Sequence, residues 1–377
     1  MSKPRSIFEE VETKIEAPQT GGIDQRPKGA RGAIRIWLMV LFGLVALMIA
    51  VGGLTRLTDS GLSITEWKPI TGAIPPLSTE AWEAEFELYQ QIPEYQLQNH
   101  GMSMAEFRFI YWWEWGHRQL GRVVGLVWAL GFFVFLTSRR IPPGWTGKLL
   151  ALGALGGLQG AIGWWMVASG LTGTMLDVAS YRLATHLGLA FLILGLISWY
   201  IFQLGRSERD LRSAHRVGEP RLASFASIVL GVTALQVLLG ALVAGIDAGR
   251  SFGDWPLMAG GFLPPGIFEL SPGWRNFFEN AGLVQFNHRI VGYVLMIAGI
   301  LLWLRSRQSP HSSTRFAASL VLAMMFVQLL LGVMTVLYGA PLNWAIAHQF
   351  GAVVLVVLVL RTRFRALYPV PDQLRKS

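Results

Sequence analysis

The chain has 377 residues, of which 52% are hydrophobic and only 15% are charged. This balance is outside the range of ordinary soluble domains and is typical of a protein that crosses a membrane several times. Cysteine is absent, which excludes disulfides, zinc–thiolate sites and iron–sulfur clusters. We attribute the formal net charge of +9 to membrane topology and lipid headgroups, and expect no nucleic-acid partner.

The apolar segments predict an all-α polytopic membrane protein with eight transmembrane helices, because one span needs about 20 mostly apolar residues. In chain order the spans are expected at residues 34–56, 118–137, 149–169, 184–204, 224–246, 285–304, 316–338 and 343–361. Residues 1–33 and 362–377 are expected to form polar tails. The first tail contains both acidic and basic residues, which is typical of neither a signal peptide nor a mitochondrial transit peptide.

Basic residues recur in every second connection, and such loops face the cytoplasm. Arg139, Arg140 and Lys148 lie in one of them, and the segment 206–221 contains five arginines. The alternate connections are longer and rich in carboxylates. Both termini are therefore predicted to be cytoplasmic, and we expect the protein in a bacterial inner membrane.

The four spans before about residue 210 resemble the four that follow. The matching segments are DSGLSITEW (59–67) with DAGRSFGDW (247–255), GHRQLGRVVG (116–125) with NHRIVGYVLM (287–296), LQGAIGWWMV (158–167) with VQLLLGVMTV (327–336), and ATHLGLAFLI (184–193) with AIAHQFGAVV (345–354). Duplication of a four-span unit places both copies in the membrane in the same direction. The repeat predicts two pseudo-symmetric four-helix bundles, at residues 34–210 and 221–361.

Four of the seven histidines are predicted at the start of spans that begin on the outer side of the membrane. His117 and His186 belong to the first half, and His288 and His348 have the corresponding places in the second. Two imidazoles on facing helices of a bundle can ligate one haem iron from both sides. We therefore expect one bis-histidine haem site in each half, near the periplasmic face.

Other interpretations of these histidines are open but fit less well. Each histidine could be an interfacial side chain hydrogen-bonded to a carbonyl, but ionisable groups inside a membrane usually mark a functional site. A zinc or non-haem iron site would need three or four close ligands, and only Glu114 lies near a histidine at helical spacing. Arg118, Arg122 and Arg289 could pair with haem propionates or extend to lipid headgroups. Glycines near the histidines, such as Gly121, could leave room for a flat macrocycle.

Five segments together resemble the haem A synthase family, in its bacterial and mitochondrial type without outer-loop cysteines. They are TRLTDSGLSITEWKPITGAIPPL (55–77), EFRFIYWWEWGHRQLGR (106–122), ATHLGLAF (184–191), FNHRIVGY (286–293) and AHQFGA (347–352). The similarity covers roughly residues 30 to 360. It implies an oxidoreductase that converts the C8 methyl group of haem O to a formyl group by successive hydroxylations, giving haem A for cytochrome oxidase.

The resemblance also implies a division of labour between the two halves. His288 and His348 would ligate a permanent haem b, whereas His117 and His186 would face the substrate haem O. It further implies that a haem O synthase hands over the substrate and that an electron donor, which the sequence does not identify, serves the enzyme.

The first half has a long outer connection, at about residues 57–111, and such an insertion suits a substrate site. Glu66, in the ITEW segment, is the predicted catalytic carboxylate, and Asp59 and Glu114 are weaker candidates.

Two other functions compete with this prediction. The main alternative is a di-haem membrane electron-transfer protein, but a transmembrane haem chain needs histidines near both faces, and all four lie on one side here. A transporter would need broken helices and polar residues at the membrane midplane, where this chain has mainly glutamines. Both are less well supported than haem chemistry at the outer face.

Overall fold

The structure is a computed structural model that describes residues 29–173 and 175–370. Within these ranges, eight helices are long and apolar enough to cross a membrane. They are α1 (Gly29–Leu57), α4 (Met104–Thr137), α5 (Thr146–Val167), α6 (Ser180–Leu204), α8 (Pro220–Gly245), α10 (Ala281–Ser306), α11 (Ser312–Leu337) and α12 (Leu342–Leu367). Each coincides with one predicted span, so the all-α fold with eight spans is confirmed.

The boundaries of the predicted tails differ from the structure. The helix α1 begins at Gly29, and α12 continues to Leu367, beyond the expected end of the last span at 361. The rest of both tails, residues 1–28 and 371–377, lies outside the described part of the chain.

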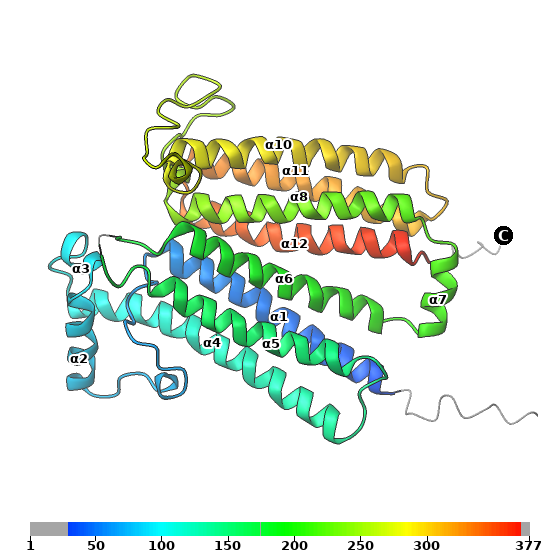
Figure 1. The fold of residues 1–377 in the computed structure, drawn as a ribbon, viewed down its shortest axis with the longest axis horizontal. Helices are drawn as coiled ribbons and strands as arrows, with labels where there is room; N and C mark the ends of the chain where they lie inside the picture. Colours follow the sequence, from blue (N-terminus) through cyan, green and yellow to red (C-terminus); the bar gives the residue numbers. More distant parts are fainter. Residues whose placement is uncertain (1–28, 174, 371–377) are drawn as a thin grey trace, which may run out of the picture.

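The eight long helices run side by side as two neighbouring groups, α1, α4, α5 and α6 in one and α8, α10, α11 and α12 in the other (Figure 1). The groups meet where α1 and α6 pack against α8 and α12. The apolar core at this junction includes Leu38, Leu194 and Val356, which are all buried. The long connections gather at one end of the molecule (Figure 1). This arrangement supports the predicted pair of bundles.

The long connection between α1 and α4 folds into short helices that the sequence did not predict. It contains η1 (Thr71–Ala73), α2 (Thr79–Gln90) and α3 (Pro93–Leu97). Aromatic side chains hold these pieces together: Trp82 and Tyr89 of α2 are buried against Phe107 and Tyr111 of α4. The connection between α8 and α10 contains only η2 (Ala248–Arg250), η3 (Gly273–Arg275) and α9 (Asn276–Glu279).

The helix α4 begins at Met104, whereas the predicted span began at residue 118. The reason is a capping box: the Ser103 hydroxyl accepts from the backbone N–H of Glu106, and the Glu106 carboxylate accepts from the backbone N–H of Ser103. The buried aromatic face of the next two turns then extends the helix outward. As a result, His117 lies within α4 and not at its start.

A further unpredicted helix, α7 (Glu208–Arg216), lies between the two groups at the end opposite the long connections (Figure 1). Ser207 caps its first turn, with acidic residues near its start and basic residues near its end, as the helix dipole favours. Arg31 of α1 pairs with Glu208 and donates to the carbonyl of Arg206. These contacts fix the connection between the two halves against α1.

Candidate functional site

The second half brings His288 of α10 and His348 of α12 together. Their ring centres are 6.3 Å apart and their planes are inclined by 82°. Two metal–nitrogen bonds of about 2 Å each, with the distance from each nitrogen to its ring centre, add up to about 6 Å. Both Nδ1 atoms are buried without a hydrogen-bond partner. The pair therefore fits one iron between two imidazoles.

The first half carries its two histidines on the equivalent helices. His117 lies on α4 and His186 on α6, and the two rings are close enough to interact electrostatically. The four histidines thus occupy four different helices, two in each half, as the sequence predicted. Among the described residues, no cluster of three or more histidine or carboxylate side chains that could hold a metal ion occurs.

Each of the four histidine rings lies against a glycine on a neighbouring helix. A Cβ atom built on these glycines would lie 2.8–3.1 Å from the imidazole, a separation at which the ring must move. The pairs are Gly52 with His117, Gly163 with His186, Gly240 with His288, and Gly332 with His348. Absence of a side chain at these points lets the rings turn into the bundle.

Three of these glycines follow a glutamine by one helical turn, and the glutamine contacts the same histidine. Gln159, Gln236 and Gln328 each donate an amide N–H to the backbone carbonyl of His186, His288 and His348, over 3.0–3.1 Å. The amide nitrogens of Gln159 and Gln236 also lie 3.2–3.4 Å from a ring nitrogen. The side-chain oxygens of all three glutamines are buried and unpartnered.

From the sequence, the glutamines were noted only as polar residues in the middle of spans, and other glycines were favoured as neighbours of the histidines. Gly121 and Gly292, on the histidine helices, face Met48 and Gln236, so they allow helices to pack closely. The missed signal was the spacing Q-x-x-x-G, which occurs at 159–163, 236–240 and 328–332.

The arginines that follow the histidines bind the outer connections. Arg118 donates to the carbonyls of Ile64 and Glu66. Arg289 donates to the carbonyls of Phe252 and Asp254. The sequence repeat aligns Ile64 with Phe252 and Glu66 with Asp254, so the two halves use the same contact. Arg122 likewise donates to the carbonyls of Lys68 and Pro69. All three arginines therefore bind backbone carbonyls of the outer connections, and a propionate or headgroup partner stays a prediction.

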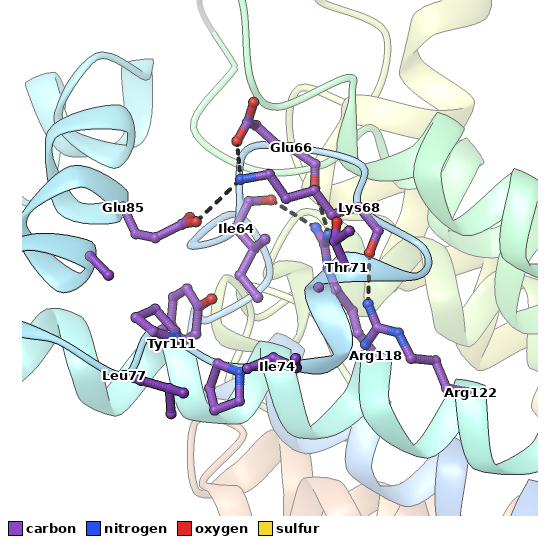
Figure 2. A pocket seen from close by; sticks show the side chains of 14 residues that line it. Ile64, Glu66, Lys68, Thr71, Ile74, Leu77, Glu85, Tyr111, Arg118 and Arg122 are labelled. Carbon is purple, nitrogen blue, oxygen red and sulfur yellow. Dashed lines mark hydrogen bonds and ion pairs between the residues drawn. The ribbon is translucent and has the colours of Figure 1, made fainter.

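The predicted carboxylate Glu66 lies at the rim of a pocket of about 380 Å³, beside Arg118 and Arg122 (Figure 2). Its side chain is 47% exposed and pairs with Lys68, which also contacts Glu85. The pocket lies on the outer connection next to α4, and its lining contains none of the four histidines.

Glu114 is much more enclosed, because its side chain is only 3% exposed. It lies one turn before His117 on α4. Its carboxylate accepts from the Ser63 hydroxyl and the Ile64 amide at 2.8 Å, and from Arg118. Of the two carboxylates, Glu114 is therefore the one held in a fixed position near a histidine.

Eight helices long and apolar enough to cross a membrane, joined by short helices and loops, define an all-α polytopic membrane protein. Residues 35–360 match the profile of a family described as cytochrome oxidase assembly protein. The chain is 69% identical over 379 aligned residues to a protein named heme A synthase from Dinoroseobacter shibae, covering 100% of this chain and 99% of that protein.

Similar proteins of the same name occur in two further bacteria. The identity is 62% with that of Ruegeria pomeroyi, over 100% of both chains, and 58% with that of Paracoccus denitrificans, over 98% of both. The chain belongs to the haem A synthase family.

Proposed function

We propose that the protein synthesises haem A by oxidising the C8 methyl group of haem O to a formyl group through successive hydroxylations. Family membership supports haem A synthesis as the reaction. The observation that carries the proposal is that four histidines form two matched pairs, one in each half of the molecule. Each histidine lies on its own helix and against its own glycine. Two such pairs suit one haem that is a permanent cofactor and a second haem that is the substrate.

In this proposal, His288 and His348 hold haem b. The 6.3 Å separation of their ring centres and their unpartnered Nδ1 atoms fit this group. When bound, haem b would supply one-electron transfer to the other half. His117 and His186 bind the substrate haem O, and the same half carries the larger outer connection.

The proposed catalytic carboxylate lies in the same half. Glu66 was predicted from the sequence as the catalytic carboxylate. Its exposure and its ion pair with Lys68 instead favour a structural role at the surface of the outer connection. Glu114 is the better candidate, because it is buried one turn from His117 and held by three donors. Its fixed position suits a group that orients the substrate or accepts a proton from it.

The membrane setting follows from the basic connections. We propose that the protein lies in a bacterial inner membrane with both termini in the cytoplasm and both histidine pairs near the periplasmic side. A haem O synthase in the same membrane would deliver the substrate, and a separate donor would supply electrons.

Pigment analysis of purified protein tests the proposal. We expect His117→Ala to retain haem b and to lack haem A, and His288→Ala to lose haem b, as measured by extraction and chromatography. Equal loss of haem b from both variants would instead indicate two equivalent cofactor sites, as in a di-haem electron-transfer protein. Wild-type protein without haem would contradict both functions.

A further inference from the structure

Each of the four histidine rings lies against a glycine, but one site differs from the others in the residue four positions before that glycine. Three of them have the sequence Q-x-x-x-G on the helix that faces the ring, and the fourth, at His117, has MIAVG (48–52). In the repeat, Met48 of α1 corresponds to Gln236 of α8, just as Gly52 corresponds to Gly240.

The structure places Met48 in the same position as that glutamine. Its terminal Cε lies 3.0 Å from where a Cβ on Gly121 would be, one turn after His117. The Gln236 amide nitrogen lies 3.2 Å from the matching point on Gly292, one turn after His288. Both side chains are partly buried. Met48 and Gln236 therefore occupy equivalent positions and differ in the chemistry of their side chains.

The glutamines offer two things that methionine lacks. Each amide N–H is hydrogen-bonded to the carbonyl of its histidine, and the amide nitrogens of Gln159 and Gln236 also lie 3.2–3.4 Å from a ring nitrogen. A neighbouring group that fixes the position of a metal-ligating histidine makes it a stronger ligand, and loss of that group weakens metal binding. A thioether has no donor and is only a weak acceptor.

Accepting the proposed function, we propose that Met48 is a positioning residue that makes His117 the weakest of the four ligands. The three histidines with a glutamine hold their iron firmly. His117 lacks this support, so the first half releases its haem. Such release is required because haem A is a product that must leave the enzyme. The second half, with a glutamine at both histidines, retains its cofactor.

The test compares how fast haem leaves each half. Wild type, Met48→Gln, Met48→Leu and Gln236→Met are purified, and haem transfer to excess apomyoglobin is followed by absorption, with chromatography identifying the haem lost. Removing or adding such a supporting group changes metal affinity by about 10–100-fold. We expect Met48→Gln to slow loss of haem O and haem A by about tenfold and to increase the low-spin signal in electron paramagnetic resonance.

Met48→Leu is the matched control, because it removes the sulfur without adding an amide, and it should release haem like wild type. Gln236→Met is the reciprocal change and should accelerate loss of haem b by about tenfold. The inference would be overturned if the Met48→Gln variant retained haem b but released haem O and haem A at the wild-type rate. Slower release of these haems from the Met48→Leu variant would also overturn it. If the Met48→Gln variant also loses haem b, the Gln236→Met variant becomes the deciding test. Release of haem b from Gln236→Met at the wild-type rate would then overturn the inference.

Turnover of added haem O separates the two proposals. If the wild type converts haem O to haem A but the Met48→Gln variant releases haem at the wild-type rate, only the proposed role of Met48 is overturned. Wild type that holds haem but does not convert haem O overturns the proposed function.

Discussion

At the scale of single residues, Glu94 of α3 is unusual because a carboxyl group is buried in the outer connection. Its side chain is 3% exposed, and Asn99 donates to one oxygen while the other has no partner. Burial, followed by the nearby charges of Asp177, Glu114 and Asp59, raises the pKa of Glu94 to about 8. The carboxyl is therefore protonated in the folded protein at neutral pH.

The raised pKa of Glu94 predicts a pH-dependent stability. Between the ordinary value of 4.5 and about 8, the folded state binds a proton that the unfolded state has lost, so stability falls as the pH rises through this window. The slope is at most about 1.4 kcal/mol per pH unit. Thermal unfolding of wild type and Glu94→Gln in detergent at pH 5 to 9 measures it. We expect the variant to lose this part of the pH dependence, and parallel curves would contradict the assignment.

A second residue-scale prediction concerns the glycines that face the histidines. A Cβ at Gly163 would lie 2.8 Å from the His186 ring, so Gly163→Ala must displace the imidazole. We expect haem A formation to fall at least about tenfold, because small misplacements of a reacting group cost that much, while haem b is retained. Gly160→Ala on the same helix is the control, since its Cβ would meet nothing within 4 Å. Equal activity of the two variants would show that His186 tolerates the shift.

At the scale of elements, each outer connection is fastened to the helix that carries a histidine. Arg289→Ala removes the donors that hold the carbonyls of Phe252, Asp254 and Leu257. Hydrogen bonds from a charged donor contribute about 1.5–3 kcal/mol. We therefore expect backbone amides in 252–260 to exchange hydrogen at least about tenfold faster, as read by mass spectrometry. Arg275→Ala, which breaks an exposed pair with Glu279, should leave them unchanged.

The elements also show what the sequence could predict. All eight spans were predicted, because an apolar run long enough to cross a membrane is a strong signal. The helices α2, α3 and α7 and the outer turns of α4 were missed, since they mix polar and aromatic residues and depend on tertiary packing and caps such as Ser103.

The candidate site was predicted in outline only. The histidines were found because their type and spacing repeat. The facing glycines could not be assigned, because only the structure shows which helix lies against each ring, and Met48 interrupts the one motif that would have linked all four.

At the scale of the whole molecule, Arg56 joins the two halves at the outer face. Its side chain is 12% exposed, and its guanidinium pairs with Asp59 and Asp177 of the first half and with Asp247 of the second. Asp59 and Asp247 are repeat equivalents, and both adopt a left-handed backbone, with φ of 47° and 50°, which aspartate tolerates. Arg56 therefore pairs with three carboxylates drawn from both halves, one of which, Asp247, also pairs with Arg250.

Loss of this cation should loosen the contact between the halves. We expect Arg56→Gln to destabilise the protein by about 1–3 kcal/mol, less than for a fully buried pair because the aspartates are partly exposed. Thermal unfolding at low and high salt measures the effect, and wild type should lose more stability with salt than the variant. Arg212→Gln, in an exposed pair on α7, is the control. A variant as stable as wild type at low salt would show that apolar packing alone joins the halves.

The difference between Met48 and Gln236 has an evolutionary consequence. A four-helix ancestor that assembled as a symmetric dimer would carry the same residue at this place in both subunits, because one gene encodes both. Its two sites would then hold their haem equally well. Fusion of two gene copies would free each copy to diverge, and under the proposed role of Met48 a single change on α1 would make one site release the haem that the other keeps.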